Sequence, residues 1–216
     1  NLPLYTTPPH STASTTRLSH SMPNILITGT PGTGKTTLAA ALAEAHPEMR
    51  HVELSKLIAT QELHEGRDEH FDTLIFDDDK VVDYLEDVMD IHKHRNTIVD
   101  FHTSDFFPER WFDLVIVLRT AAEPHFQRLT EKGYSQHKIT ENVDAEILQV
   151  CLDEALDSYH HSIIKELQSD NVDQMDENIE WVNNWLSTWT PDMTPAPSHL
   201  QQAQEEYGYS DDDALI

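Results

Sequence analysis

The sequence predicts an α/β fold with a doubly wound sheet of five parallel strands, and three observations support this prediction. Short apolar runs alternate with helical patterns over residues 23–190, as in strands linked by crossover helices. The run at 114–118 is apolar throughout, which is typical of a parallel strand covered on both faces. A glycine-rich segment directly follows the first apolar run, and such sheets bind ligands at the carboxyl ends of their strands.

The first part of the chain contains two expected strands and two expected helices. An apolar run predicts a strand at 24–28, and the alanine-rich run after the glycines predicts a helix over 35–46. A second strand at 51–54 leads into a helix at 55–63, which a serine can cap at its first residue. The polar residues 64–72 show no period, so we expect a mobile insertion on the substrate side there.

The rest of the chain continues the alternation of helices and strands. The expected elements are a helix at 77–89, strands at 97–100 and 114–118, helices at 121–132 and 142–161, a strand at 163–167 and a helix at 176–189. The aspartates at 77–79 favour a helix start by capping, with a substrate role as the alternative. Thr140 or Asn142 can cap the long helix. The pattern at 163–167 fits a continued helix almost as well as a strand.

The composition limits the class of protein. The 216 residues suit one domain with tails: we expect a disordered leader at 1–22 and a disordered acidic tail at 191–216. Fourteen Lys and Arg face 39 Asp and Glu, for a net charge of −25, which disfavours direct nucleic-acid binding and suits a basic protein partner; simple solubility is the alternative. The single cysteine, Cys151, fits a reducing compartment. No apolar run approaches the ~20 residues that span a bilayer.

The glycine-rich segment has the spacing of a phosphate-binding loop. Residues 29–36 match G-x-x-x-x-G-K-T between an apolar run and a strong helix former. Its glycines permit backbone dihedrals that side chains forbid, so consecutive N–H groups can surround a phosphate at the positive end of the helix dipole. We expect Lys35 to reach the β- and γ-phosphates and the Thr36 hydroxyl to bind Mg²⁺. A chance turn of Gly and Thr is the alternative, which the flanking elements disfavour.

A nucleotide site also needs an acid that organises the metal, and Asp100 ends the strand at 97–100. The alternative is an aspartate that only caps the strand end. His102 lies two residues further on, so strand alternation turns it the same way as Asp100. It could orient a water or move a proton, although a lone histidine is more often structural.

Three arginines and one lysine are candidates for phosphate binding. Arg110 lies just past the strand that Asp100 ends, where a guanidinium could fork a phosphate or instead pair with an acidic neighbour. Arg119, Arg128 and Lys132 surround the loop after the fourth strand. Lys132 could close over ATP, whereas Arg128 could simply pair with carboxylates of its own helix.

Several motifs occur together along the chain. They are the loop region 23–37, V-D-F-H at 99–102, D-F-F-P-E-R-W at 105–111, V-L-R at 117–119 and K-G-Y at 132–134. Together they resemble the adenylate kinase isoenzyme six family, which includes the fungal small-ribosomal-subunit biogenesis ATPase. The resemblance covers about 23–190. It implies a P-loop NTPase fold like that of nucleoside monophosphate kinases, with a monophosphate-binding insertion at about 53–76 and a short lid at about 131–141.

The resemblance also implies an activity and partners. It implies ATP with Mg²⁺, ATPase activity, and phosphoryl transfer to AMP or another nucleoside monophosphate. It further implies cytoplasmic and nuclear work on the pre-ribosomal particle, in small-subunit maturation and pre-rRNA processing, through a basic ribosomal protein of the subunit platform. A purely metabolic adenylate kinase and a nucleotide-switched chaperone of a ribosomal protein are the alternatives.

The candidate site residues combine the resemblance with the residue-level argument. They are Lys35, Asp100 and His102 for catalysis; Thr36 and Asp100 for the metal; Pro31, Gly32, Gly34, Lys35, Thr36, Thr37 and Lys132 for ATP; and Arg110, Arg119 and Arg128 for the substrate. Two positions depart from the family pattern: Ala59 stands where a basic residue is usual, and Lys132 where arginine is common. Because lysine lacks the bidentate fork of arginine, we expect ATP hydrolysis to exceed phosphoryl transfer to a monophosphate.

Overall fold

The computed structural model describes residues 22–68, 73–89 and 96–191, so the expected leader and acidic tail lie almost entirely outside it. Within this part the chain forms a five-stranded parallel sheet in the order β2-β5-β1-β6-β7 and a separate antiparallel hairpin, β3-β4. The strands are β1 (Ile25–Thr28), β2 (Arg50–Glu53), β3 (His64–Asp68), β4 (Thr73–Phe76), β5 (Thr97–Asp100), β6 (Leu114–Arg119) and β7 (Ile164–Gln168).

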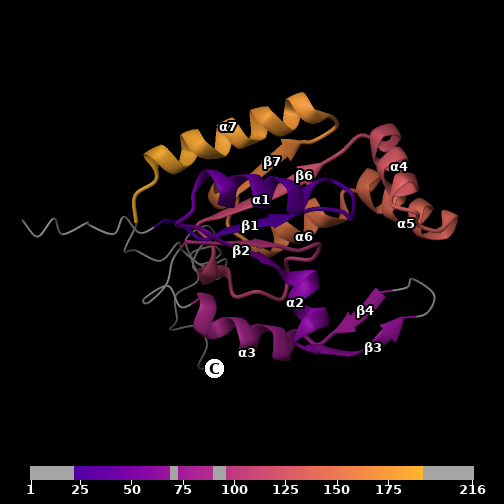
Figure 1. The fold of residues 1–216 in the computed structure, drawn as a ribbon, viewed down its shortest axis with the longest axis horizontal. Coiled ribbons are helices and arrows are strands. Elements are labelled where there is room, and N and C mark those ends of the chain that lie inside the picture. The colour runs from indigo at the N-terminus through magenta and orange to yellow at the C-terminus, as the bar shows by residue number, and fades with distance from the viewer. Residues whose placement is uncertain (1–21, 69–72, 90–95, 192–216) are drawn as a thin grey trace, which may run out of the picture.

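The parallel sheet confirms the predicted fold class. Its order puts β1 in the centre, with β5 and β2 on one side and β6 and β7 on the other (Figure 1). The chain therefore changes its direction of winding at β1, and the crevice at such a switch point is the usual ligand site of an open α/β sheet. The last strand, β7, pairs with β6 from Val115↔Ile164 to Arg119↔Gln168, so the alternative of a continued helix is wrong.

Helices cover both faces of the sheet. They are α1 (Lys35–Ala45), α2 (Leu54–Thr60), α3 (Asp78–Met89), α4 (Ala122–Glu131), α5 (Gln136–Ile147), α6 (Val150–Ser158) and α7 (Val172–Thr188), with 3₁₀ turns at Glu109–Trp111 and His161–Ile163. Helices α1 and α7 pack on one face, and α2, α3 and α6 on the other (Figure 1). No helix in the described ranges is both long and apolar enough to span a bilayer.

Alternating side chains of the strands supply the two halves of the core. Leu26 and Val99 point toward α2, α3 and α6, whereas Ile25, Ile27 and Ile98 point toward α1 and α7. All five are fully buried. Because both faces of β1 and β5 are covered, these strands read as unbroken apolar runs in the sequence, as a parallel sheet requires.

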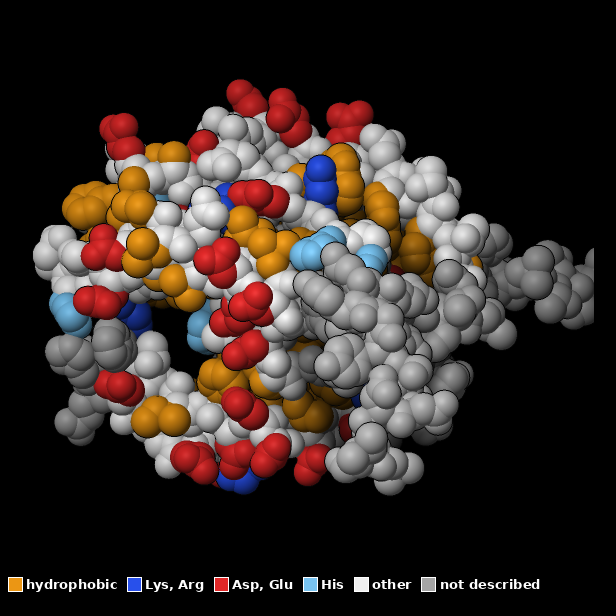
Figure 2. Space-filling view, turned by 180° about the vertical axis from the view of Figure 1, so that it is seen from behind, with side chains coloured by type: hydrophobic (Ala, Val, Ile, Leu, Met, Phe, Trp, Pro, Cys, Tyr) orange, Lys and Arg blue, Asp and Glu red, His pale blue; other side chains and the backbone are white. Residues whose placement is uncertain are grey.

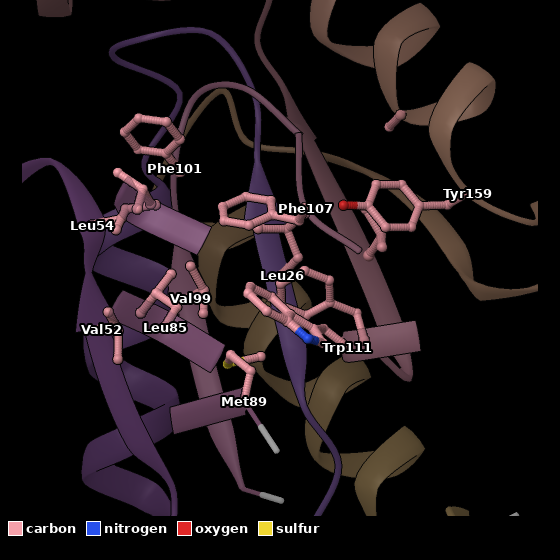
Figure 3. Packing of buried hydrophobic residues seen from close by; sticks show 14 of the residues in the cluster. Leu26, Val52, Leu54, Leu85, Met89, Val99, Phe101, Phe107, Trp111 and Tyr159 are labelled. Atoms are coloured by element: carbon pink, nitrogen blue, oxygen red, sulfur yellow. The ribbon is translucent and has the colours of Figure 1, made fainter. Parts of the chain in front are cut away.

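Aromatic side chains of the 105–111 motif fill the first of these halves (Figure 3). Phe107 packs against Trp111 with ring centroids 6.2 Å apart and against Phe112 at 5.6 Å. Trp111 is 2% exposed, and Tyr159, which directly follows α6, is completely buried. The Tyr159 hydroxyl donates to the Ser104 carbonyl at 2.7 Å, so this aromatic cluster fixes the segment that follows Asp100.

The expected irregular insertion at 64–72 is wrong in the described part of that segment. Strands β3 and β4 pair from His64↔Phe76 to Asp68↔Thr73. The first strand reads H-E-G-R-D and carries no apolar alternation, which hid it from a pattern-based prediction. Among the described residues of the hairpin strands, only Leu74 and Phe76 pack against the core, and both lie on β4, so backbone pairing rather than side-chain burial defines β3.

The expected long helix at 142–161 is also wrong, because two helices, α5 and α6, take its place. Ser135 caps α5 by accepting from the Lys138 amide, which neither Thr140 nor Asn142 does. The break lies at Gln149, whose φ is 62°. A straight helix would point residues 146 and 151 in different directions, whereas the break turns both toward the phosphate-binding loop.

Candidate active site

The loop between β1 and α1 is tightly packed against its surroundings. Gly29 has a φ of 137°, and a Cβ at this position would lie 2.5 Å from the Leu118 carbonyl oxygen. Gly32 has a φ of 100°, and its Cβ would lie 2.8 Å from Leu129 Cδ2. Only glycine combines this backbone conformation with so little space, so the loop can curl closely over β6 and α4. The helix begins at Lys35, as the sequence predicts.

Lys35 points into this loop. Its Nζ donates to the Gly29 carbonyl at 2.6 Å and to the Thr30 carbonyl at 3.1 Å, and the residue is 9% exposed. Burial lowers the pKa of the ammonium from 10.5 to about 8, and nearby acidic groups, Asp100 and Glu146 among them, partly offset that effect. A buried ammonium inside a curl of backbone N–H groups at a helix start is the donor set that a polyphosphate needs, so these residues fit ATP.

Asp100 lies at the carboxyl end of β5 with both carboxylate oxygens hydrogen-bonded. The Thr36 hydroxyl donates to Oδ1 at 3.1 Å, and His51 Nε2 donates to Oδ2 at 2.5 Å. Asp100 is 3% exposed, so these two partners take the place of water. The structure thus brings together the two residues that the sequence predicts for the metal. Hydroxyl and carboxylate oxygens suit Mg²⁺, which therefore fits here.

His102 lies beyond the end of β5, beside the hairpin. Its ring is 4.4 Å from the Phe101 ring and 6.3 Å from the Phe76 ring of β4, centroid to centroid. Burial, with smaller effects of Lys35 and Lys138, lowers the pKa of His102 from 6.5 to about 4. The imidazole is therefore neutral near pH 7, and it can accept a hydrogen bond without carrying charge.

Arg119 is part of a buried ionic network that the sequence did not reveal. Its Nε donates to Glu146 Oε1 at 2.7 Å, and its Nη1 donates to Glu166 Oε1 at 2.9 Å. Glu146 is 3% exposed, and it also accepts from the Thr30 hydroxyl at 2.5 Å and from the Thr120 amide at 3.1 Å. Arg119 therefore lies close to the loop, but in this structure its guanidinium binds carboxylates.

The other candidate cations lie in different places. Arg110 is exposed and forms a 3.3 Å pair with Glu86, which is the acidic-neighbour alternative. Arg128 donates to the Ser169 carbonyl at 2.7 Å rather than to carboxylates of its own helix. Lys132 is exposed and directly follows the last residue of α4. Their roles in binding phosphate stay predictions.

His125, on α4, is a second residue that sequence reasoning missed. Its side chain is fully buried below the loop, and its Nε2 donates to the Pro31 carbonyl at 2.8 Å. A carbonyl can only accept, so Nε2 carries the proton, and burial lowers the pKa of the ring. The histidine thus ties α4 to the phosphate-binding loop. Its position within an amphipathic helix gave no signal of this contact.

The remaining predicted ATP-binding residues lie in the loop and in the first turn of α1. Thr36 and Thr37 are exposed in the first turn of α1. Gly34 has a φ of 103° and closes against α7, where a Cβ would lie 2.9 Å from Met175 Cε. Seen from behind, the molecule has a hollow between the part that holds the hairpin and the part that holds α4 and α5, and acidic side chains spread over this face (Figure 2).

A phosphate-binding loop after the central strand of a five-stranded parallel sheet, with an acid at the end of the neighbouring strand, defines an α/β P-loop protein with the fold of a nucleotide kinase. A family model described as an AAA domain matches residues 25–149. Among solved structures, the shikimate kinase of Bacteroides thetaiotaomicron superposes with a TM-score of 0.54 at 17% identity, covering 77% of this chain and 99% of that one, which shows the fold alone.

Curated relatives narrow the class further. The chain is 47% identical to the adenylate kinase isoenzyme 6 homolog of Dictyostelium discoideum, over 80% of this chain and 96% of that protein. It is 42% identical to the homolog of Schizosaccharomyces pombe, over 78% and 94%. It is 35% identical to the homolog FAP7 of Saccharomyces cerevisiae, over 89% and 96%. The chain belongs to the adenylate kinase isoenzyme 6 family, and it is an adenylate-kinase-like P-loop nucleotide kinase.

Proposed function

We propose that this chain binds ATP with Mg²⁺ and hydrolyses it, and that it transfers phosphoryl groups to AMP or another nucleoside monophosphate more slowly. The adjacency of Lys35, Thr36 and Asp100 at one loop carries the proposal. Lys35 is buried with two carbonyl partners, and polyphosphate oxygens are stronger acceptors for an ammonium than carbonyls are. Bound Mg²⁺ would neutralise charge that develops on the phosphate oxygens.

In this proposal the chain's own residues position the reactants. The loop amides and Lys35 hold the β- and γ-phosphates, while Thr36 and Asp100 present oxygen ligands beside them. Neutral His102 accepts a hydrogen bond from an attacking water or acceptor hydroxyl and orients it. With a pKa of about 4 the imidazole of His102 is a weak base, so its role is to orient the nucleophile. The proton that the nucleophile loses passes to the product phosphate or to solvent.

Two features support hydrolysis as the faster reaction. Position 59 of helix α2 is alanine and offers a monophosphate no cation, while Lys56 on the same helix offers an ammonium without the bidentate fork of arginine. Arg110, the candidate phosphate-binding residue that follows β5, is exposed and paired with Glu86. Phosphoryl transfer requires the monophosphate to be bound in line with the γ-phosphate, so weak binding of the monophosphate lowers the transfer rate directly. Hydrolysis uses water, which needs no such binding site.

A coupled assay of ADP formation tests the proposal. ATP alone should give slow ADP formation that Asp100→Asn and His102→Ala both reduce, and AMP should raise the rate only modestly. AMP-dependent formation far above the hydrolysis rate would favour the purely metabolic kinase instead. Full activity of both variants would contradict the assigned roles.

We further propose that the activity serves small-subunit maturation in the cytoplasm and nucleus, through a basic ribosomal protein on the pre-ribosomal particle. The net charge of −25 supports a basic partner. Purified chain should retain such a ribosomal protein in a pull-down that weakens as salt rises, and ATP should change the amount retained. An Asp100→Asn/His102→Ala variant that still supports maturation in cells would favour the chaperone alternative. Retention that ignores salt and nucleotide would contradict this part of the proposal.

A further inference from the structure

The carboxylate of Asp100 is held from two different elements. Helix α1 supplies the Thr36 hydroxyl to one oxygen, and strand β2 supplies His51 Nε2 to the other. The side chains of His51 and Asp100 are 18% and 5% exposed, so the pair is largely shielded from water. An aspartate's χ2 torsion is broad and intrinsically loose. Two donors on opposite oxygens remove that freedom, and the plane of the carboxylate becomes fixed.

The sheet register explains how a residue on β2 reaches Asp100. The parallel pairing aligns His51 with Ile98 and Glu53 with Asp100. Since side chains two residues apart share a face, His51, Ile98 and Asp100 all lie on the α1 face. The ring at 51 then extends forward along that face to the carboxylate. A histidine one position earlier or later would point to the other side of the sheet.

Of the two donors, only the hydroxyl has a second task in the proposed function. A hydroxyl that donates to Asp100 still has lone pairs for a metal, so Thr36 can serve both. A ring N–H has no lone pair, so Nε2 of His51 can only orient the acid. Residues that orient metal-organising groups in this way strongly affect metal affinity without touching the metal.

We propose that His51 is a positioning residue for the metal site: its N–H fixes the rotation of the Asp100 carboxylate and so sets the affinity for the divalent cation of the nucleotide complex. The inference rests on the proposed binding of ATP with Mg²⁺ and names a residue on which that binding depends. It assigns His51 no contact with nucleotide. The loop at 29–34 holds phosphate independently of His51, so the residue should matter only when metal is present.

The experiment compares nucleotide affinity with and without metal in three variants of the full chain. His51→Leu removes the N–H donor and puts an apolar side chain of similar bulk in its place. His51→Gln restores an N–H donor at a similar reach. His46→Leu is the control: it removes a neighbouring histidine on the same face, whose Nε2 bonds Asn183 Oδ1 at 2.8 Å and has no contact with Asp100. Thermal unfolding reports that each variant is folded.

Three readouts separate positioning from general damage. In EDTA, all variants should bind ATP as the unaltered chain does. With Mg²⁺, His51→Leu should lose roughly tenfold or more in ATP affinity, and Mn²⁺ binding to the ATP complex, followed by electron paramagnetic resonance, should weaken by a similar factor. His51→Gln should recover most of this loss, and His46→Leu should match the unaltered chain throughout.

Four outcomes would contradict the proposed role of His51. Unchanged Mg²⁺ and Mn²⁺ dependence in His51→Leu overturns the inference while leaving the proposed function intact. Equal losses in EDTA and in Mg²⁺ overturn it too, because they would show a structural role that is independent of metal. A loss that His51→Gln fails to recover contradicts the role of the N–H donor. Failure of the unaltered chain to bind ATP at all overturns the proposed function itself, and the inference with it.

Discussion

Glu146 accepts a hydrogen bond from the Thr30 hydroxyl at 2.5 Å, across 116 positions of sequence, and so joins α5 to the phosphate-binding loop. The same carboxylate holds Arg119 and the Thr120 amide at the end of β6. A single buried acid therefore sets the distance between the loop and the next strand end. Its position near the end of α5 makes that helix a support of the phosphate-binding loop.

We expect Glu146→Ala to destabilise the protein by about 3–5 kcal/mol, because it leaves a largely buried guanidinium and a buried amide without their carboxylate. Glu166→Ala is the matched control, since Glu166 also binds Arg119 but has a side chain that is 51% exposed. It should cost about 0–1 kcal/mol. Urea unfolding measures both, and equal effects would mean that the buried network does not support the loop.

Replacement of Gly32 by alanine should weaken ATP binding and cost about 1–3 kcal/mol of stability. The new Cβ would have to share space with Leu129 and adopt an unfavourable φ of 100°. Gly66→Ala is the control, because its Cβ would meet nothing within 4 Å. Thermal unfolding and ATP titration should show a clear loss only for Gly32→Ala. An unaffected Gly32→Ala protein would contradict the tight packing of the loop.

The lowered pKa of Lys35 predicts proton uptake when ATP binds. At pH 8.5 a group with a pKa of about 8 is largely neutral, and bound phosphates favour its charged form. The complex therefore holds more protons than the free chain, and ATP affinity should fall as pH rises above 8. Calorimetry at pH 8.5 in buffers with different ionisation enthalpies measures the uptake. Lys35→Arg keeps a cation that stays charged at pH 8.5, so it should bind ATP without this uptake, and identical uptake in that variant would assign the proton to another group.

His102 should make folding stability depend on pH. Its pKa is about 4 when folded and near 6.5 when unfolded, so between these values the unfolded chain binds more protons. Stability from this group is complete above pH 6.5 and is lost as pH falls toward 4, by an amount on the order of 2–3 kcal/mol. Urea unfolding of the chain and of His102→Asn at pH 4.5 and 7.5 isolates the effect. Parallel pH profiles would show that His102 is not shielded from water.

The parts of the structure that sequence alone could predict are those built from local patterns. The apolar run at β6 and the glycines after β1 are visible in the sequence. The contact between Thr36 and Asp100, the two residues predicted for the metal, follows once the strands are known to be parallel. Strand β3 of the hairpin has no local apolar pattern. It is defined instead by its backbone pairing with β4, which a local pattern does not show. Pattern reasoning therefore had nothing to detect there.

The supporting contacts of the site could not be predicted for a different reason. His51 reaches Asp100 only because β2 and β5 pair in one particular register, and Glu146 reaches Thr30 only because the helix breaks at Gln149. His125 lies under the loop because α4 returns across it. Each contact joins residues that are distant in the chain, and a single sequence does not show which distant residues lie close together in space.

The most direct test of the account is calorimetric titration of ATP, in magnesium buffer and in EDTA, into the unaltered chain and into Lys35→Met and Asp100→Asn. The unaltered chain should bind ATP, and more tightly with magnesium. Lys35→Met should lose binding in both buffers, whereas Asp100→Asn should lose only the gain that magnesium brings. No binding by the unaltered chain, or an unchanged magnesium effect in Asp100→Asn, would contradict a polyphosphate cradle whose metal is organised from the end of β5.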